Sequence, residues 1–210
     1  MRILLSAALA VTLISAFSQE PTPTYAAAPY ERIEVVKLTD STRTADDLYK
    51  AAKRWFVDAF RDAQEVIQLD DPATHMIVGK GNFTYEAFIY VGSAVRHGVM
   101  RFSAEIAARN GRYRVRFYDF KHEGSSSYNT TIGRSPPLDL GVIYNDQTFC
   151  THAYNKKGEP DYEPSKHEVR VCTEEVWPQI HAFELRMLSS LKEAMENPAP
   201  ASSGPGSSDW

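Results

Sequence analysis

The chain has 210 residues, with 23 lysines and arginines against 27 aspartates and glutamates, so its formal net charge is −4. Nucleic-acid binders usually carry a basic surplus, and this mild acidity argues against nucleic acid as a partner. Between positions 31 and 196 there remain roughly 165 residues once both ends are set aside, which fits a single domain.

Residues 1–18 have the pattern of a cleavable secretory signal. Arg2 precedes an apolar run that ends at Phe17, and Ala16 and Ser18 stand at the spacing that a signal peptidase needs. The run is shorter than the roughly 20 residues of a stable membrane helix, so we expect no transmembrane anchor in the mature protein. We therefore expect an exported protein, periplasmic or extracellular.

Two flanking segments have the composition of unstructured chain. Residues 19–30 contain "QEPTPTYAAAP", which has linker composition, and a cut after its alanine run would also leave the folded part intact. Residues 197–210, "NPAPASSGPGSSDW", consist largely of proline, serine, glycine and alanine without periodicity. This composition predicts a disordered tail.

The first predicted elements are a strand and an amphipathic helix. Residues Arg32–Leu38 are β-branched and lie between Pro29 and a polar run, which indicates a strand. Thr44 and Asp47 then form an approximate capping box. The large apolar residues that follow, up to Ala63, recur at spacings of three and four, so they share one face of a helix.

A charged corner and a Gly-Lys-Gly sequence come next. "EVIQL" predicts a short strand, "DDPA" a turn, and "HMIVGKG" a second strand that ends at Gly79 and Gly81. A phosphate loop needs a different glycine spacing and leads into a helix, whereas the residues after Gly81 alternate like a strand. We predict a turn or bulge at the glycines. A catalytic pair of Asp70 and Asp71 is the less favoured alternative, because adjacent turn residues normally diverge.

The clearest local structure is a β-hairpin that turns at Asn110-Gly111. The turn predicts three facing pairs: Arg109 with Arg112, Ala107 with Arg114, and Glu105 with Arg116. One face is apolar and is expected to form core, with Met100, Phe102, Ala104, Ile106, Ala108, Tyr113, Val115 and Phe117. The other face must look outward, with Arg101, Ser103, Glu105, Arg109, Arg112, Arg114, Arg116 and Tyr118.

The last predicted element is an amphipathic helix over 174–196. Thr173 is its expected cap. Pro178 fits only in or near the first turn, so a start closer to Trp177 is the alternative. Two one-faced helices and a one-faced antiparallel sheet predict a two-layer α+β domain, in which both helices cover one side of the sheet. The other side of the sheet is expected to be open.

Several motifs occur in a specific order. "VVKL" precedes a helix with "LYKAAKRWFVDAF", and "VIQLDD", "IVGKGNF" and "GRYRVRFYDFKHE" follow. From Ile33 to Glu123 this order resembles the secreted bacterial domain of unknown function 4468, which has a TBP-like fold. The resemblance implies a curved antiparallel sheet backed by helices. It implies no activity, substrate or catalytic residue, and DNA binding does not follow from the fold.

Residues 124–171 form a long insert between the family-like core, 33–123, and the closing helix. "GVIYN" and "EVRVC" in this insert are strand-like. Cys150 and Cys172 are the only two cysteines, and in an exported chain they are expected to form a disulfide that joins the insert to the start of the helix. A catalytic thiol is the less favoured alternative, because no base is positioned by the sequence.

The outward face of the hairpin is the candidate binding surface. Its candidate residues are Arg101, Arg109, Arg112, Arg114, Arg116 and Tyr118, which could hold an anionic glycan, a phospholipid headgroup or an acidic partner segment. The alternative is a solvated strand face on which Glu105 neutralises Arg116, and this alternative is favoured. The insert could also cover the face. The six histidines show no strong metal spacing, and we expect neither a metal nor a cofactor.

Two functional hypotheses remain. The first is a non-catalytic binding or assembly module that engages an envelope protein or an anionic glycan through the open sheet face, the insert, or both. The second is a hydrolase or transferase whose site lies between the sheet and the insert, because catalytic groups need only meet in three dimensions. The first is preferred, since the sequence contains an export signal and no coherent catalytic set.

Overall fold

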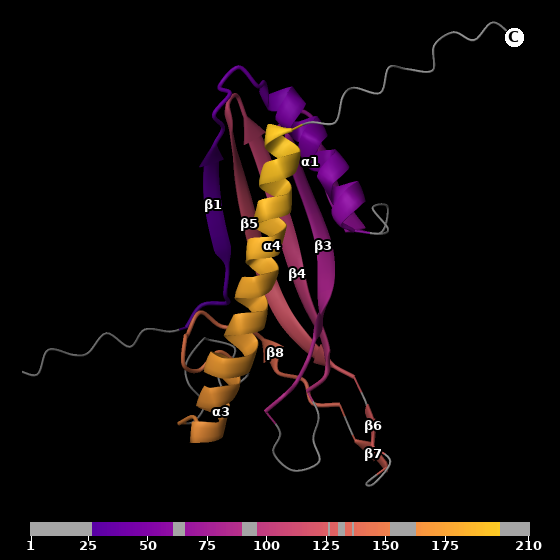
Figure 1. The fold of residues 1–210 in the computed structure, drawn as a ribbon, viewed down its shortest axis with the longest axis vertical. Helices are drawn as coiled ribbons and strands as arrows, with labels where there is room; N and C mark the ends of the chain where they lie inside the picture. Colours follow the sequence, from indigo (N-terminus) through magenta and orange to yellow (C-terminus); the bar gives the residue numbers. More distant parts are fainter. Residues whose placement is uncertain are drawn as a thin grey trace, which may run out of the picture.

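The fold is a two-layer α+β domain with both long helices on one face of an antiparallel sheet (Figure 1). This computed structural model describes residues 27–60, 66–89, 96–125, 127–129, 133–135, 137–151 and 163–197. The sheet order is β1-β5-β4-β3-β2, and β8 pairs with the far end of β5. The strands are β1 Arg32–Lys37, β2 Ile67–Asp71, β3 Met76–Tyr85, β4 Gly98–Arg109, β5 Arg112–Gly124 and β8 Gly141–Val142. A separate small ladder joins β6, Ser127–Asn129, to β7, Gly133–Ser135.

Helix α1, Ala45–Ala59, begins as the sequence predicts. Thr44 and Asp47 form the reciprocal capping box, and the helix buries its apolar stripe, including Leu48, Ala52, Trp55 and Phe56. The helix stops at Ala59, and the predicted end near Ala63 lies outside the described residues. The Trp55 indole N–H donates to the Ser190 hydroxyl at 2.9 Å, which joins α1 to the C-terminal helix.

The Gly-Lys-Gly sequence lies inside a continuous strand, so the prediction of a turn there is wrong. A bulge does occur opposite Gly79, but the extra residue belongs to the partner strand β2, where the register shifts between Ile67 and Leu69. Strand β3 keeps an unbroken register against β4 from Met76 to Tyr85. A Cβ on Gly79 would lie 2.5 Å from the Phe56 ring, and one on Gly81 would lie 2.5 Å from the Phe60 ring. The glycines are therefore needed because α1 packs its aromatic rings directly on the strand backbone.

The hairpin of β4 and β5 has the predicted register, with Arg109 opposite Arg112 and Glu105 opposite Arg116. All eight predicted core residues of this hairpin are buried. One irregularity interrupts it: between Arg101 and Ser103 the register shifts, and Asp119 opposite this step has φ of 56°. The bulge gives β5 an extra residue and allows Phe120 to join the core.

The turn of this hairpin is tied to the segment between β1 and α1. Gly111 donates its N–H to the Arg43 carbonyl at 2.8 Å and accepts from Leu38 at 2.9 Å. The Asn110 side-chain oxygen accepts from the Ala45 N–H at 2.8 Å, the first amide of α1. The turn therefore satisfies one of the amides that a helix start leaves without an intrahelical partner.

The C-terminal helix begins eight residues before the predicted start at 174, and the prediction of Thr173 as its cap is wrong. Ser165 and Glu168 form the capping box, and the helix then runs through α3, a π turn and α4. The three parts are Lys166–Arg170, Val171–Val176 and Trp177–Glu196. The strand-like "EVRVC" is helical for this reason. The wide turn lies directly before Pro178, which has no N–H to donate and whose ring crowds the carbonyl four residues earlier.

The described part of the insert packs at the end of the sheet opposite the hairpin turn (Figure 1). Leu140, Ile143 and Cys150 are buried there, and Cys150 forms the expected disulfide with Cys172, their Cα atoms 5.7 Å apart. Residues 137–151 therefore do not cover the candidate arginine face, although the sequence left that arrangement open.

The predicted linker over 19–30 overlaps the folded domain at its end. Pro29 forms a bridge with Tyr144, and Tyr30 is buried and donates its hydroxyl to Glu184 at 3.0 Å. The predicted signal segment 1–18, residues 19–26 of the linker and residues 198–210 of the tail lie outside the described residues. None of the helices in the described part of the chain has the length and apolar character needed to span a bilayer.

Candidate functional site

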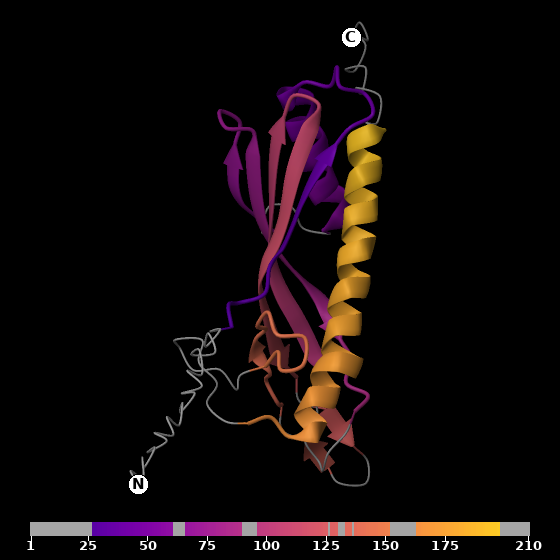
Figure 2. The ribbon, with the colours of Figure 1, turned by 90° about the vertical axis from the view of Figure 1, so that its left-hand side faces the viewer.

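One face of the sheet carries both long helices, and no helix of the described chain lies on the other (Figures 1 and 2). The alternation of β4 and β5 places all six candidate side chains on this outer face. They are Arg101, Arg109, Arg112, Arg114, Arg116 and Tyr118. The neighbouring strand β1 adds Ile33 and Val35, which are 50% and 59% exposed.

The middle of this face is electrically balanced, but not by the predicted pair. Glu105 is the cross-strand neighbour of Arg116, yet it forms its ion pair with Arg114 instead. Arg116 is paired with Glu31 at 2.6 Å, and its guanidinium lies 4.4 Å from the centre of the Tyr118 ring. The prediction failed because Glu31, just before β1, competes for Arg116 and leaves Glu105 to a diagonal neighbour.

Arg101 is also neutralised, at the end of the face far from the hairpin turn. It forms an ion pair with Glu123, and the hydrogen bond between them holds the pKa of the Glu123 carboxyl below its ordinary value. Three of the five candidate arginines therefore have a carboxylate partner. These surface pairs each contribute little to stability, under about 1 kcal/mol.

The end of the face next to the hairpin turn differs, because its cations have no carboxylate partner. Arg109 faces Arg112 across the β4–β5 ladder, and Arg112 faces Lys37 across the β5–β1 ladder. Among the described residues none of the three forms an ion pair. We call Lys37, Arg109 and Arg112 the cation row. Like charges placed directly opposite each other on a sheet are destabilising.

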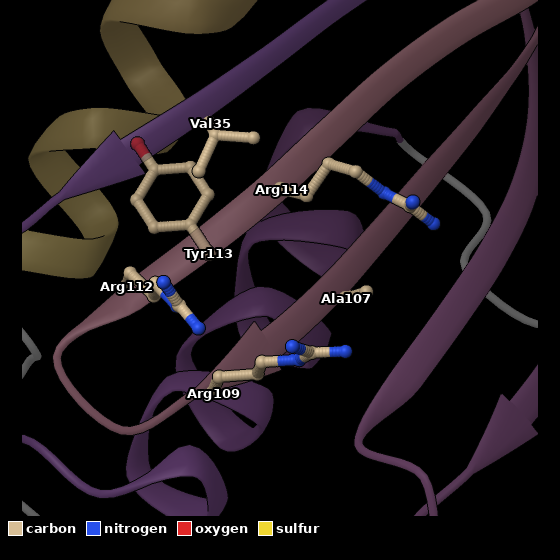
Figure 3. A pocket seen from close by; sticks show the side chains of 6 residues that line it. All are labelled: Val35, Ala107, Arg109, Arg112, Tyr113 and Arg114. Atoms are coloured by element: carbon tan, nitrogen blue, oxygen red, sulfur yellow. The ribbon is translucent and has the colours of Figure 1, made fainter.

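Two adjoining hollows lie at the cation row. The first, of about 320 Å³, is lined by Val35, Ala107, Arg109, Arg112, Tyr113 and Arg114. Figure 3 shows the side chains of Arg109 and Arg114 on either side of Ala107, with the Arg112 side chain directed toward Arg109. The second hollow, of about 450 Å³, shares Arg109 and Arg112 and reaches Lys37 and Ser41. This corner of the face combines concave shape with uncompensated positive charge.

The paired carboxylates Asp70 and Asp71 are not brought together. Asp70 accepts hydrogen bonds from Tyr49 and Lys53 on α1, and the buried contact raises the pKa of the Tyr49 hydroxyl to about 12. Asp71 closes the turn, accepting from the Ala73 N–H at 2.9 Å and from the Thr74 hydroxyl at 2.6 Å. Each carboxylate therefore has its own structural partners.

A buried polar cluster at the other end of the sheet escaped the sequence analysis. The Glu175 carboxylate accepts hydrogen bonds from the Tyr85 hydroxyl at 2.7 Å, the Phe88 and Ile89 amides at 2.9 and 2.7 Å, and Arg96 Nε at 3.2 Å. Burial alone would raise the pKa of Glu175, but these bonds hold it below its ordinary value. The cluster fastens residues 86–89 and Arg96 to the π turn.

His122 belongs to the same cluster and is fully buried. Its Nδ1 accepts from the Leu140 N–H at 3.0 Å, so Nε2 carries the proton and donates to the Arg96 carbonyl at 2.7 Å. Burial lowers the pKa of His122, which keeps the ring neutral. Both ring nitrogens are thus occupied by structural bonds.

A third hollow, of about 300 Å³, lies between the insert and the start of the closing helix. It is lined by Arg96, Leu138, Leu140, Thr151, His167, Glu168 and Val171. Within the described residues, no three His, Cys, Asp or Glu side chains converge in a manner suited to a metal ion.

Lys37 is the member of the cation row that the sequence analysis left out. The signal was present, since the alternation of the predicted strand Arg32–Leu38 puts residues 33, 35 and 37 on one face. Its significance depended on knowing that this strand pairs with β5, which only the fold supplies.

The comparison with protein families agrees with this architecture. Residues 34–123 match the family model described as "Domain of unknown function (DUF4468) with TBP-like fold". This part of the chain is thus similar to that family's domain, in the region that the motif order indicated. No curated protein matches the chain.

Two solved structures are similar to the chain. One is a DUF4468 family protein from Bacteroides ovatus, with 12% identity and a TM-score of 0.49, covering 82% of this chain and 90% of that one. The other is a TBP-like protein from Parabacteroides distasonis, with 7% identity and a TM-score of 0.46, covering 77% and 92%.

Proposed function

We propose that this protein is an exported, non-catalytic binding module that holds an envelope component, either a protein or an anionic glycan, on the open face of its sheet. The observation that carries the proposal is the cation row beside a hollow on that face. The three cations of this row have no carboxylate partner within the described residues. Negatively charged groups on a binding partner could pair with them.

The composition of the face supports the same proposal. Exposed Ile33 and Val35 on β1 lie next to the arginines of β5, so that apolar and cationic groups alternate across adjacent strands. Arginine beside exposed apolar side chains is typical of surfaces that bind partners, since its guanidinium is weakly hydrated and forms several hydrogen bonds at once.

The proposal is tested by capture from the native cell envelope. Arg112, Arg114 and Arg116 are replaced together by serine, and mild crosslinking with mass spectrometry compares what the two mature proteins retain. We expect an almost unchanged melting temperature, because exposed ion pairs contribute little, and loss of the captured partner. If the variant still captures the same partner, the arginines of this face are not the binding surface.

A matched control removes three cations from the helical side of the molecule. Lys50, Arg170 and Lys192 each form an exposed ion pair on a helix. Replacing all three by serine changes the net charge by the same amount as the first variant. Capture by this control should equal that of the wild type; an equal loss would show that net charge alone governs retention.

A hydrolase or transferase is the second candidate function, favoured by one observation. The hollow between the insert and the closing helix contains His167, Glu168 and Thr151, although the sequence analysis expected such a site between the sheet and the insert. If it is a catalytic site, His167→Ala will abolish a hydrolytic activity found by screening ester, phosphoester and glycoside substrates. Equal activity of this variant and the wild type would count against the second candidate.

A further inference from the structure

We propose that the hairpin end of the open face is a preformed site for a small soluble molecule carrying a phosphate monoester, with the phosphate seated over Ala107 among Arg109, Arg112 and Arg114. This inference rests on the proposed function and deepens it, because it names the chemical group that the face recognises.

The first step of the argument is charge. Arg109, Arg112 and Lys37 form a continuous row across three strands, and no carboxylate of the described residues forms an ion pair with any of them. Of the other arginines, Arg114 lines the same hollow and is paired with Glu105, while Arg101 and Arg116 are paired farther along the face. A row of unneutralised like charges costs the fold stability, and a bound dianion would remove that cost.

The second step is shape. Ala107 is the smallest side chain on the outer face of β4, and the side chains of Arg109 and Arg114 extend on either side of it (Figure 3). The result is a hollow of about 320 Å³ lined by Val35, Ala107 and Tyr113 together with three arginines. Guanidinium groups bind phosphate with two parallel N–H···O bonds each, which suits several of them around one tetrahedral group.

The third step is rigidity. The turn that carries Arg109 and Arg112 is held by three hydrogen bonds to the segment between β1 and α1: Leu38 N–H to the Gly111 carbonyl, Gly111 N–H to the Arg43 carbonyl, and Ala45 N–H to Asn110 Oδ1. Both flanking arginines therefore start from a backbone that is already ordered. A preformed site saves the entropy of ordering it during binding.

The fourth step is the choice of occupant. The hollow is larger than a phosphate group, so it leaves room for the small body that bears the phosphate. The whole chain is acidic, with a formal charge of −4, and Glu31 and Glu105 lie on the same face. An anionic bilayer surface would be repelled by this wider field, whereas a small dianion in the hollow lies nearest to Arg109 and Arg112, which have no carboxylate partner among the described residues.

The test is calorimetric titration of the mature full chain at constant ionic strength. The probe is glucose 1-phosphate, and methyl glucoside, which has the sugar without the phosphate, is the matched control ligand. We expect saturable binding of the phosphate ester and none of the glucoside. No heat of binding from the phosphate ester, or equal binding of both sugars, would overturn the inference.

Variants locate the site. Arg112→Ser should weaken the affinity about tenfold or more, since it removes a charge-assisted hydrogen-bond donor. Ala107→Glu should abolish binding while the melting temperature stays equal or rises, because the new carboxylate would occupy the space between Arg109 and Arg114. Ala107→Leu fills the same space without a charge and should also abolish binding. Unweakened binding in these three variants would overturn the placement of the site.

The control variant is Lys192→Ser, which removes one positive charge from the helical side of the molecule. Its affinity for glucose 1-phosphate should match that of the wild type within about twofold, because at moderate salt an exposed charge on the other side of the sheet is largely screened. A tenfold loss would show that the probe responds to net charge, which contradicts a defined site.

Two further outcomes separate this inference from the proposed function. Binding to vesicles containing phosphatidic acid, without binding of the soluble ester, would overturn the choice of occupant. If no phosphate ester binds but the Arg112, Arg114 and Arg116 variant still loses its envelope partner, the phosphate site is wrong and the binding module stands. If envelope capture also survives, both proposals fail.

Discussion

The two ends of the sheet differ in whether their charged side chains are buried and paired or exposed and unpaired. At the disulfide end, where Cys150 joins Cys172, Arg96 and Glu175 are almost completely buried, and every hydrogen-bonding group of their cluster has a partner. At the hairpin end, Lys37, Arg109 and Arg112 are exposed and have no ion-pair partner within the described residues. Buried charge tolerates no missing partner, because water cannot replace it, whereas exposed charge remains available to a ligand.

The strongest way to break this comparison is to leave a buried charge without its partner. Glu175→Ala removes the acceptor of four hydrogen-bond donors. It leaves the Arg96 side chain, which is only 4% exposed, without its carboxylate partner. We expect a loss of about 3–5 kcal/mol in the free energy of unfolding, measured by urea denaturation. The double variant Arg96→Met with Glu175→Leu should be markedly less destabilised. An equal loss in both would show that packing, not charge, dominates the cluster.

Removing the disulfide destabilises the same end of the molecule, mainly because it raises the conformational entropy of the unfolded chain. The bond closes a loop of 22 residues, so replacing Cys150 and Cys172 by alanine should cost about 3 kcal/mol. Urea denaturation of the oxidised protein and the variant measures the difference, and mass spectrometry of the unreduced protein verifies the bond. Free thiols at both positions would contradict the disulfide.

Glu184 gives the disulfide end a pH-dependent contribution to stability. It is 3% exposed, and burial raises its pKa from 4.5 to about 7, although Tyr30 donates a hydrogen bond to it. Because the folded state binds this proton more tightly than the unfolded state, the contribution of Glu184 to stability falls as pH rises from about 4.5 to 7.

Glu184→Gln should therefore be more stable than the wild type at pH 8 by on the order of 2–3 kcal/mol, and the two should converge near pH 4.5. Thermal unfolding of both proteins between pH 4 and 8 measures the difference. Comparing the pair cancels the titration of His122, whose lowered pKa acts in the opposite direction, so that its contribution is lost as pH falls. A constant difference across this range would disprove the role of Glu184.

The smallest effect is expected at the hairpin end. Arg112→Glu places a carboxylate between Arg109 and Lys37 and converts two like-charge neighbours into opposite-charge neighbours. Stability should rise by less than about 1 kcal/mol in urea denaturation at low salt, and the gain should shrink at high salt. Arg101→Glu, which destroys the pair with Glu123, is the control and should destabilise. A destabilised Arg112→Glu would mean that the cation row is not strained by its charges.

Local chemistry made much of the fold predictable. The capping box of Thr44 and Asp47 predicts the start of α1, and Asn110-Gly111 predicts the register of the hairpin. Two cysteines in one chain allow only one intramolecular pairing. In each case the deciding residues are close in sequence or have no competitor. The outer face of β4 and β5 followed directly from that register.

The failures have the opposite origin, because they depend on residues far apart in the chain. Gly79 and Gly81 are explained by the rings of Phe56 and Phe60. Arg116 forms its ion pair with Glu31 rather than Glu105, and Glu175 bonds to Arg96, which is 79 positions away in the sequence. The early start of the closing helix is a different failure. Its capping box, Ser165 with Glu168, was visible, but the alternation in "EVRVC" outweighed it.

The hydrogen bonds at the hairpin turn make two distant pieces of chain open together. Leu38, Ala45 and Gly111 donate their amides across the junction of β1, α1 and the turn. Each of these hydrogen bonds joins two of the three segments, so we expect the three amides to be protected together in hydrogen exchange. A molecule seated beside Arg109 and Arg112 would slow their exchange further, and the exchange of the Ala45 amide on α1 would then report occupancy of the face on the opposite side of the sheet.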